Sequence, residues 1–529
     1  MGLRLGSVLG FAGVTLASAS ALGMTYKVGP GETYTQLSQV SGLLNPGDVV
    51  ELEGDATYNG GVVFSRNGTA AQRIRIVGVP KNGKRPVISG ATNTVEAAGD
   101  HYVFEGLELT GGSFRCFYHH AHDITLRDSV VRDCAKHGVL GADQDSGSLL
   151  MEYVEVFGSG GGTQDHQIYM ATDETAHPGS VFRMQFCYVH GANGGNNVKS
   201  RAERNEIYYN WIEGALYHEL ELIGPDGQNP ALAREDSDVV GNVLVKTQTS
   251  YVVRFGGDGT GETFGRYRFV NNTVIVQPGG SAVFRLFHGI DSLEAHNNVF
   301  WMNGSGAMKL VRTVEANFTS GSPKLSGQNN YLPPGATDVP SEWTATLAAA
   351  TPGFVSLGGW DLMPADGSVL INAGAASLAA PAGYDFPSPL GVPAFHPPPR
   401  ALLPVGTAAA RPANGAIDVG AFEHGPPATG SGGGAGSGGA GSGGGAGSGG
   451  SGGGAGSGGG VGSGGAPGSG GGTSSGGAPT ASGDGADDGG CGCRTTRGAP
   501  GSGLLALVLG TLALGRRRRP PGLRGRSRT

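Results

Sequence analysis

The sequence has 529 residues, of which 101 are glycine, and a formal net charge of −7. Residues 430–490 hold 34 of the glycines, and the other 468 residues still hold 67, about twice the average share. This glycine content, without sustained apolar spacings of three and four residues, excludes a helical bundle. Residues 22–490 carry 26 basic and 43 acidic residues, a net charge of −17. Because such an acidic body repels phosphate backbones, we expect no nucleic-acid partner.

Residues 1–21 have the composition of an export signal. Arg4 precedes an apolar run from Leu5 to Ala17, and small residues follow at Ala19 and Ala21. This order predicts a signal peptide that is cleaved after Ala19 or Ala21, and hence an exported protein. A buried or amphipathic first helix is the alternative, since the run is too short to span a bilayer by itself.

The folded body is predicted to begin at residues 24–100, with a cap and the first rungs of a coil. Its segments VVELE (49–53), VVFSR (62–66) and RIRIVG (73–78) alternate apolar and polar residues, as half-buried strands do.

Residues 101–320 repeat one short apolar phrase, from FEGLEL (104–109) to HNNVF (296–300). The phrase returns every 22 to 33 residues, which is typical of parallel β-helix turns with insertions. We therefore predict an all-β, single-stranded, right-handed parallel β-helix, with residues 321–425 as C-terminal rungs and cap. The predicted solenoid resembles that of the pectate lyases. The predicted interior stack consists of Leu109, Val131, Val156, Val189, Ile212, Leu244, Val274 and Phe300.

Asparagines recur at one place in successive turns, at Asn210, Asn242, Asn272 and Asn298. A bend in left-handed geometry favours asparagine, and stacked amides can hydrogen-bond along the coil. We interpret these asparagines as structural.

Each turn contains a further strand, from HQIYMA (166–171) to AVFRLF (282–287). If the central apolar residues point inward, their neighbours point outward, about 4.8 Å apart from rung to rung. The predicted outward column is Tyr169, Lys199, Glu221, Arg254 and Arg285, with Gln167, Asn197 and Glu219 one pleat away and His166, His190 and His218 at the edges. Such a column is either a glycan-binding groove or a solvated face whose charges alternate.

Three of the five cysteines lie in the body. Cys116 and Cys134 are 18 residues apart, so export makes a disulfide between them plausible, with Cys187 as a buried thiol. Three unpaired buried thiols are the alternative.

Beyond the body, residues 426–490 form a predicted flexible Gly/Ser-rich linker, and residues 491–529 follow as an anchor segment. Cys491 and Cys493 precede a short apolar stretch, which ends in four arginines at 516–519. The arginines place the C-terminal side in the cytoplasm if the stretch enters a membrane.

This order of cysteine, apolar segment and arginines resembles the MYXO-CTERM sorting signals of myxobacteria. The resemblance implies that a sorting protease processes the chain at Cys491 or Cys493 and that the protein is attached to the cell surface or outer membrane. A plain C-terminal transmembrane anchor is the alternative.

The end of the body, RPANGAIDVGAFE (411–423), resembles the ends of secreted β-helix proteins that act on polysaccharides. The segment GGNNVKSRAERNEIYYNWIEG (194–214) resembles the lysine-containing rung of the alginate lyase and chondroitinase B family. That resemblance implies Lys199 as the base that removes the proton next to a uronate carboxylate, calcium on the carboxylate, and an arginine that assists the leaving group. Two positions depart from the family pattern. Gly194, Gly195 and Asn196 stand where its calcium ligands would precede the lysine, and Leu220 stands near its arginine.

A broader resemblance, over residues 100–300, is to secreted bacterial β-helix proteins with H-x-I-Y and V-K-S-R-A segments, whose activity is unassigned. We therefore expect a cell-surface protein that binds an acidic polysaccharide or cleaves it as a lyase. In the lyase, Lys199 would be the base, Arg254 with Arg201 would neutralise the carboxylate, and His218 or Tyr169 would give the leaving group its proton. Further expected substrate contacts are Arg285, His166 and Asn197, and the expected ligands of any calcium ion are Glu219, Glu221 and Asp226.

Two other functions are considered. A non-catalytic surface binding or adhesion module would use the same column to hold a glycan. A glycosidase would need two carboxylates facing each other across a sugar, and Glu219 and Glu221 lie side by side on one strand.

Overall fold

The computed structural model describes residues 23–224, 237–257, 265–278, 282–287, 289–313, 324–378, 390, 392–413 and 415–425. The predicted signal peptide, linker and anchor segment, with Cys491 and Cys493, lie outside this range, as does Asp226. Within it, the helical structure is one short 3-10 turn, Leu37–Gln39, and no helix is long and apolar enough to cross a membrane.

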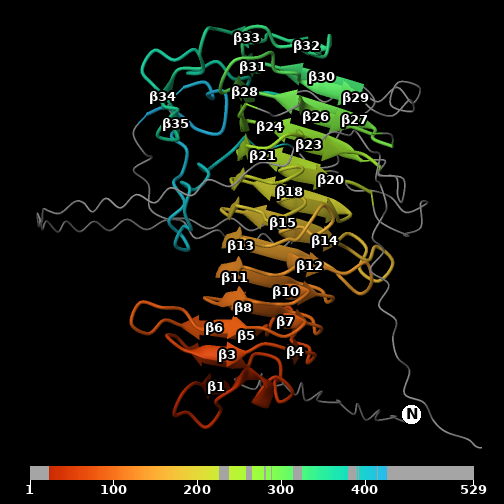
Figure 1. The fold of residues 1–529 in the computed structure, drawn as a ribbon, viewed down its shortest axis with the longest axis vertical. Helices are drawn as coiled ribbons and strands as arrows, with labels where there is room; N and C mark the ends of the chain where they lie inside the picture. Colours follow the sequence, from red (N-terminus) through yellow and green to blue (C-terminus); the bar gives the residue numbers. More distant parts are fainter. Residues whose placement is uncertain are drawn as a thin grey trace, which may run out of the picture. The chain divides into compact units, whose positions relative to one another are not determined.

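The body is a parallel β-helix, in which all but the terminal turns contribute a strand to each of three parallel ladders (Figure 1). Ladder 1 contains β1 (Thr25–Val28), β2 (Val49–Glu53), β5 (Ile74–Val79), β8 (Tyr102–Glu105), β11 (Ile124–Arg132), β13 (Leu149–Phe157), β15 (Val181–Gln185), β18 (Arg204–Tyr208), β21 (Ser237–Val240), β24 (Arg266–Val270), β27 (Ser292–His296), β30 (Lys324–Gln328) and β32 (Trp343–Thr344).

Ladder 2 contains the C-terminal halves of β11 and β13, which join it to ladder 1. Its other strands are β3 (Thr57–Asn59), β6 (Val87–Ser89), β9 (Glu108–Thr110), β16 (Tyr188–His190), β19 (Trp211–Glu213), β22 (Val243–Lys246), β25 (Thr273–Val276), β28 (Val299–Met302), β31 (Tyr331–Leu332) and β33 (Leu347–Ala348).

Ladder 3 is a separate ten-stranded parallel sheet. It contains β4 (Val62–Phe64), β7 (Asn93–Ala97), β10 (Arg115–His119), β12 (His137–Gly141), β14 (Ile168–Ala171), β17 (Val198–Arg201), β20 (Leu220–Leu222), β23 (Tyr251–Phe255), β26 (Ala282–Leu286) and β29 (Val311–Thr313). A short antiparallel pair, β34 (Phe354–Ser356) and β35 (Asp361–Pro364), follows the coil.

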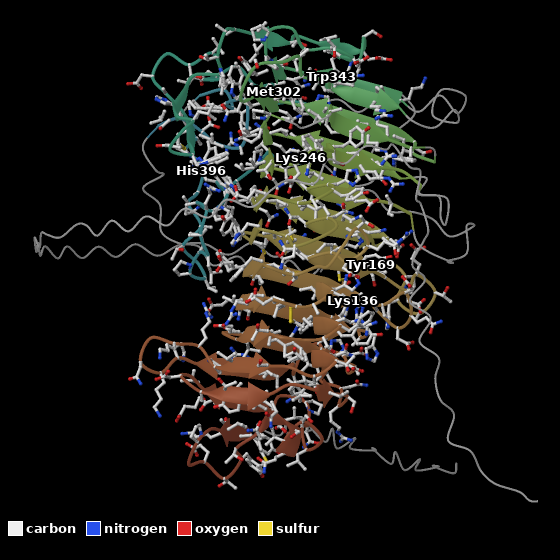
Figure 2. All side chains as sticks on the ribbon, in the orientation of Figure 1. Lys136, Tyr169, Lys246, Met302, Trp343 and His396 are labelled. Atoms are coloured by element: carbon white, nitrogen blue, oxygen red, sulfur yellow. A yellow bond between two sulfur atoms is a disulfide. The ribbon has the colours of Figure 1, made fainter. Side chains whose placement is uncertain are left out.

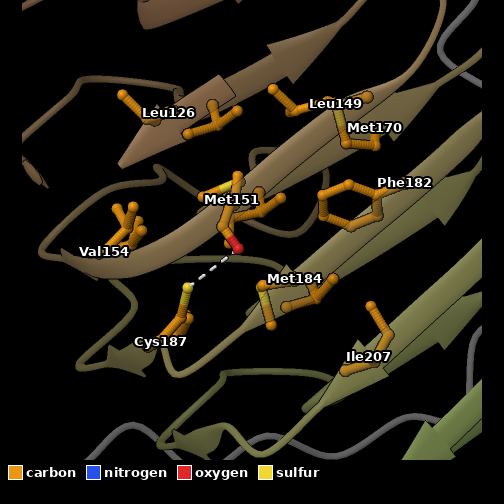
Figure 3. Close-up of a cluster of buried hydrophobic side chains, with 14 of the residues drawn as sticks. Leu126, Leu149, Met151, Val154, Met170, Phe182, Met184, Cys187 and Ile207 are labelled. Atoms are coloured by element: carbon orange, nitrogen blue, oxygen red, sulfur yellow. Dashed lines mark hydrogen bonds between the residues drawn. The ribbon is translucent and has the colours of Figure 1, made fainter. Parts of the chain in front are cut away.

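The predicted interior stack is confirmed in register. Leu109, Val131, Val156 and Val189 are successive partners in ladder 2, and the series continues through Ile212 and Leu244 to Val274 and Phe300, all fully buried. A continuous apolar core therefore runs along the inside of the coil. Figure 3 shows part of it, where the Cys187 thiol donates a hydrogen bond to the Met151 carbonyl.

The asparagine ladder lies at the corner between ladders 1 and 2. Each side-chain oxygen of Asn242, Asn272 and Asn298 accepts from the backbone N–H and the amide of the asparagine one turn earlier. Asn330, which was not predicted, continues the ladder. The left-handed residues are not these asparagines but the residues before them, including Tyr209 and Asn271, at φ of 56° and 52°. The amides are needed for hydrogen bonds along the coil, and the bend is made one residue earlier.

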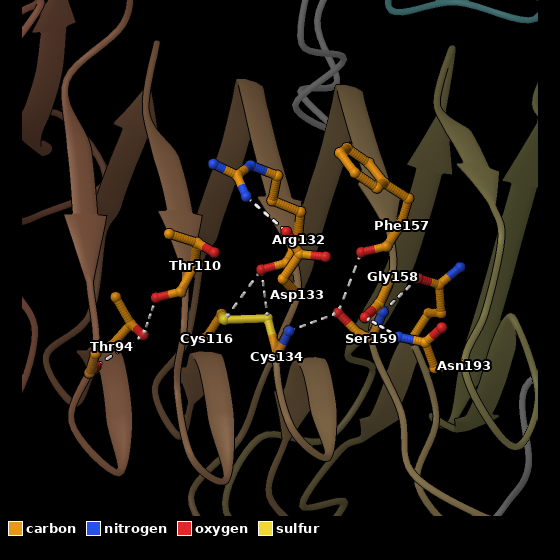
Figure 4. Close-up of a disulfide and its surroundings, with 12 residues drawn as sticks. Thr94, Thr110, Cys116, Arg132, Asp133, Cys134, Phe157, Gly158, Ser159 and Asn193 are labelled. Atoms are coloured by element: carbon orange, nitrogen blue, oxygen red, sulfur yellow. Dashed lines mark hydrogen bonds and ion pairs between the residues drawn. A yellow bond between two sulfur atoms is a disulfide. The ribbon is translucent and has the colours of Figure 1, made fainter. Parts of the chain in front are cut away.

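The two cysteine alternatives are resolved by a disulfide between Cys116 and Cys134 (Figure 4). The Ser159 hydroxyl accepts from the Cys134 N–H beside it. Cys187 is a buried free thiol, and burial raises its pKa to about 12. Such a thiol is unreactive, which suits a packing role.

The C-terminal part of the body packs against ladder 2. Leu362 and Ala421 join Trp211, Val243 and Ile275 in a second apolar cluster outside the coil. Arg400 forms an ion pair with Glu213, and the Ala421 N–H donates to Thr273. In Figure 2, His396 in this segment and Tyr169 on ladder 3 lie on opposite sides of the stack. The outer face of ladder 2 around β19, β22 and β25 is therefore covered by the protein's own chain.

Candidate functional site

The polar column on ladder 3 has the predicted register. Tyr169 pairs with Lys199, Lys199 with Glu221, Glu221 with Arg254, and Arg254 with Arg285 in successive rungs. The alternating neighbours are the inward residues Ile168, Val198, Leu220, Val253 and Phe284, all fully buried. The column continues to Arg312 on β29, which was not predicted from the strand repeat.

Glu221 connects the first two cations of the column. Its carboxylate lies 2.5 Å from an Arg254 nitrogen and 3.8 Å from the Lys199 ammonium nitrogen. Burial alone would raise the pKa of Glu221, but Lys199 and Arg254 hold it well below its usual value. The Lys199 side chain keeps 14% exposure, against 4% for that of Glu221. A carboxylate therefore lies between Lys199 and Arg254.

Three arginines follow Glu221 in consecutive rungs, each in register with the next: Arg254, Arg285 and Arg312. Aromatic rings support them, with the Arg254 and Arg285 guanidinium carbons 4.0 and 4.6 Å from the Phe287 ring centre. Arg285 and Arg312 lie 5.3 and 5.5 Å from the Tyr251 ring centre. Like charges opposite one another on neighbouring strands are destabilising, so the coil itself does not explain this run.

Tyr169 and Arg201 form a buried pair on neighbouring rungs. The Arg201 Nε–H donates to the Tyr169 hydroxyl at 3.0 Å, and an Arg201 terminal nitrogen donates to the Gly224 carbonyl. Arg201 is only 1% exposed. It therefore orients Tyr169 and would stabilise a phenolate there, whereas the sequence suggested that it contacts substrate directly.

One position beside the column is taken in three successive rungs by His166, Asn196 and His218. The Asn196 N–H donates to His166 Nδ1 at 3.0 Å, and Asn196 Oδ1 accepts from the His218 N–H at 2.9 Å. Burial lowers the pKa of both rings, that of His218 to about 3. Both imidazoles are therefore neutral at neutral pH. His190, in contrast, lies on ladder 2 and contacts Glu155.

Asn197 and Glu219 do not join the column. Both are fully buried at the corner between ladders 2 and 3, where the Asn197 amide donates to the Glu219 carboxylate at 2.5 Å. Glu219 also lies 3.3 Å from the buried Lys246 ammonium. The Asn197 amide is therefore used inside the corner, and its contact with a substrate stays a prediction. The sequence holds a sign of this corner position. Polar residues directly precede the inward residue in three successive rungs, at Gln167, Asn197 and Glu219.

The acidic residues do not fit the expected calcium ion. Glu219, directly before strand β20, is paired with Lys246, and Glu221 within it is paired with Arg254 and Lys199. Among the described residues, no group of three His, Cys, Asp or Glu side chains could hold a metal ion. Two carboxylates that already face separate cations leave no shared oxygen cage for calcium.

Four residues near the column, besides Arg312, were not predicted as site residues. Asn196 was noted only as a departure from the family pattern, yet it links Glu221 to His218. Tyr251 and Phe287 could have been found as aromatic neighbours of the arginine strands. Tyr217 is 40% exposed beside His218, and exposed aromatic rings next to polar groups are common in binding sites.

Comparisons with known proteins give distant structural similarities only. No family model matches the chain, and no curated protein matches it. The pectate lyase Pel9A is similar, with 14% identity and a TM-score of 0.49, over 77% of this chain and 97% of that chain. A PL6 family polysaccharide lyase from Pseudopedobacter saltans has 13% identity and a TM-score of 0.37, over 62% and 91%. A GH136 lacto-N-biosidase from Eubacterium ramulus has 12% and 0.32, over 58% and 67%. At such identities neither a site nor an activity transfers.

Proposed function

We propose that the protein binds an acidic extracellular polysaccharide along the outer face of ladder 3 and cleaves it by β-elimination. The observation that carries this proposal is the run of Arg254, Arg285 and Arg312 in register, beside the partly exposed Lys199. Cations stacked at about 4.8 Å match a polymer with a negative group on successive sugars. Aromatic rings beside them suit the apolar faces of sugar rings.

The chemistry assigns different tasks to the side chains. Lys199, Arg254 and Arg285 would hold the uronate carboxylate and favour the negative charge that develops on it when the neighbouring carbon loses its proton. The Tyr169 hydroxyl, with Arg201 beside it, would give its proton to the leaving glycosidic oxygen. Lys199 is assigned to carboxylate binding because Glu221 neutralises its surroundings, whereas a lysine base needs neighbouring positive charge.

A non-catalytic glycan-binding module is the second candidate, and Glu221 favours it. This buried carboxylate already contacts Lys199 and Arg254, so a substrate carboxylate would have to share both cations with it. In a binding module, the more C-terminal arginines would hold the glycan and no bond would break.

The site is proposed to work outside the cell. The Cys116–Cys134 disulfide supports export, because disulfides persist in oxidising compartments. We propose that residues 491–529 hold the protein at the cell surface, since the cysteine pair and terminal arginines have the order of a sorting signal.

The test is to incubate residues 24–425 with polygalacturonate, alginate, chondroitin and a neutral glucan. Ultraviolet absorbance of the unsaturated product measures elimination, and affinity electrophoresis measures binding. We expect product from at least one uronate polymer and neither signal from the glucan. Binding without product would support the binding module, and absence of both would overturn the proposal. Arg183→Gln, on the outer face of ladder 1, is the matched control for loss of a cation.

A further inference from the structure

The His218 ring has a buried nitrogen without a partner on the proposed polysaccharide face. Its Nδ1 lies 3.2 Å from Asn196 Oδ1, while its Nε2 makes no hydrogen bond within the part of the chain that the structure describes. The residue is only 2% exposed and its ring stacks on that of Tyr251. Buried polar atoms are nearly always hydrogen-bonded, so one that is not calls for an explanation such as a catalytic role.

The hydrogen bonds around Asn196 fix where the ring proton lies. The Asn196 amide nitrogen donates to Glu221, whose low pKa keeps the carboxylate ionised and able only to accept. Asn196 Oδ1 therefore faces His218, and since a carbonyl oxygen cannot donate, the proton must be on His218 Nδ1. This leaves a lone pair on Nε2.

The two histidines at the same position in earlier rungs of ladder 3, His137 and His166, have the opposite tautomer. Backbone N–H groups donate to Nδ1 of His166 and of His137, at 3.0 and 3.1 Å, so that both rings carry their proton on Nε2. In the next rung, Asn196 stands where these rungs have a histidine. Its side-chain oxygen faces His218 Nδ1, so the tautomer of His218 is reversed. His218 thus differs from its neighbours because of the Glu221–Asn196 connection, which a purely packing role does not require.

We propose that His218 Nε2 is the proton acceptor of the β-elimination, and that Asn196 and Glu221 are positioning residues that hold its tautomer. This inference rests on the proposed function. The bond between hydrogen and the carbon next to the carboxylate breaks, and the proton passes to Nε2. The electron pair forms a carbon–carbon double bond as the neighbouring carbon–oxygen bond breaks, and the leaving oxygen takes the Tyr169 proton. The charged ring and the phenolate then exchange protons with solvent, and no oxidant or water is consumed.

The charges around the ring couple its basicity to substrate. Burial, Arg254, Arg285 and Lys246 lower the pKa of His218, and Glu221 opposes them. A bound carboxylate on Arg254 and Arg285 would remove part of this repulsion. The ring then becomes a better base when the acidic polymer is in place.

The experiment compares His218→Gln with His137→Gln, its matched control on the same edge of ladder 3, on the uronate polymer that the unsubstituted protein cleaves. We expect His218→Gln to lower kcat at least about a hundredfold with little change in binding, and His137→Gln to stay near the parent value. Lys199→Met should instead raise KM. Asn196→Asp puts a second carboxylate beside Nδ1, so we expect the acid limb of the pH profile to move to higher pH.

A second measurement does not depend on turnover. Nitrogen-15 spectra of histidine-labelled protein, with the His218 signals identified by their loss in His218→Gln, should show a proton on Nδ1 and a bare Nε2. A proton on Nε2, or a kcat that survives His218→Gln, would overturn the assignment while leaving the lyase proposal intact. No product from the unsubstituted protein would overturn the proposed function itself.

Discussion

Two outer faces of the coil carry buried carboxylates between cations, and they differ in the balance of charge around those carboxylates. On ladder 1, Asp238 accepts from Arg268 at 2.6 and 2.8 Å and from Arg204 at 3.2 Å. On ladder 3, Glu221 contacts Arg254 and Lys199. The ladder 1 group as a whole is balanced, with Arg183, Arg204 and Arg268 beside Glu206, Asp238 and Glu294. The described ladder 3 column has four cations to one carboxylate.

The difference is between a balanced group of charges and a run of like charges, and the proposed function assigns that run to a ligand. Balanced signs on adjacent rungs satisfy one another and require no partner. Three arginines in register repel one another, a cost that an anionic ligand would offset. Ladder 1 therefore has the alternating charges of a solvated face, whereas the proposal assigns the ladder 3 run to a glycan.

The largest expected effect concerns a pair inside the corner between ladders 2 and 3. Lys246→Met leaves the fully buried Glu219 without its cation, so we expect a loss of about 3–5 kcal/mol in the free energy of unfolding. Denaturant titration measures it. The double variant Lys246→Met with Glu219→Gln should recover part of the loss; equal loss in both would show that the ion pair is not responsible.

Asp238→Asn tests the ladder 1 side of the comparison. It leaves two buried arginines facing a neutral amide, and we expect a loss of about 3 kcal/mol with unchanged polyuronate binding. Thermal unfolding and affinity electrophoresis measure the two effects. A weaker glycan interaction in the folded variant would contradict the division between the faces.

Acid should weaken the protein through buried histidines on ladder 3. Burial lowers the pKa of His119 to about 4, whereas an unfolded histidine has its ordinary value. Above about pH 6.5 neither form binds a proton, and below it the unfolded chain does so first, so stability falls as the pH drops towards 4. His119 alone should cost about 2–3 kcal/mol between about pH 7 and pH 4.5. Denaturation at both pH values measures it, with His119→Gln expected to have a smaller pH dependence.

The sequence was sufficient for the repeat and for the ladder 3 register, because inward apolar residues recur at one place in each turn. Val198 and Leu220, for example, align Lys199 with Glu221 without any knowledge of the fold. It was insufficient for Asn197 and Glu219, since strand alternation does not hold at a corner, where both side chains turn into the protein. It also could not show the Glu221–Asn196–His218 connection. These hydrogen bonds join Asn196 in one rung to two residues of the next rung, and none of these pairs is a register pair of the strands.

The smallest expected effect gives the sharpest comparison between the faces. Arg285→Gln and Arg183→Gln each remove one guanidinium, one in the ladder 3 run and one in the balanced ladder 1 group. A charge-assisted hydrogen bond contributes about 1.5–3 kcal/mol, so we expect Arg285→Gln to weaken polyuronate binding at least about tenfold. Arg183→Gln should leave the affinity unchanged, because Glu206 already pairs with that guanidinium. Affinity electrophoresis at two salt concentrations measures both, and the Arg285 variant should also show less salt dependence because one fewer ion contact is broken. Equal affinities for the two variants would mean that the arginine run does not bind the polymer.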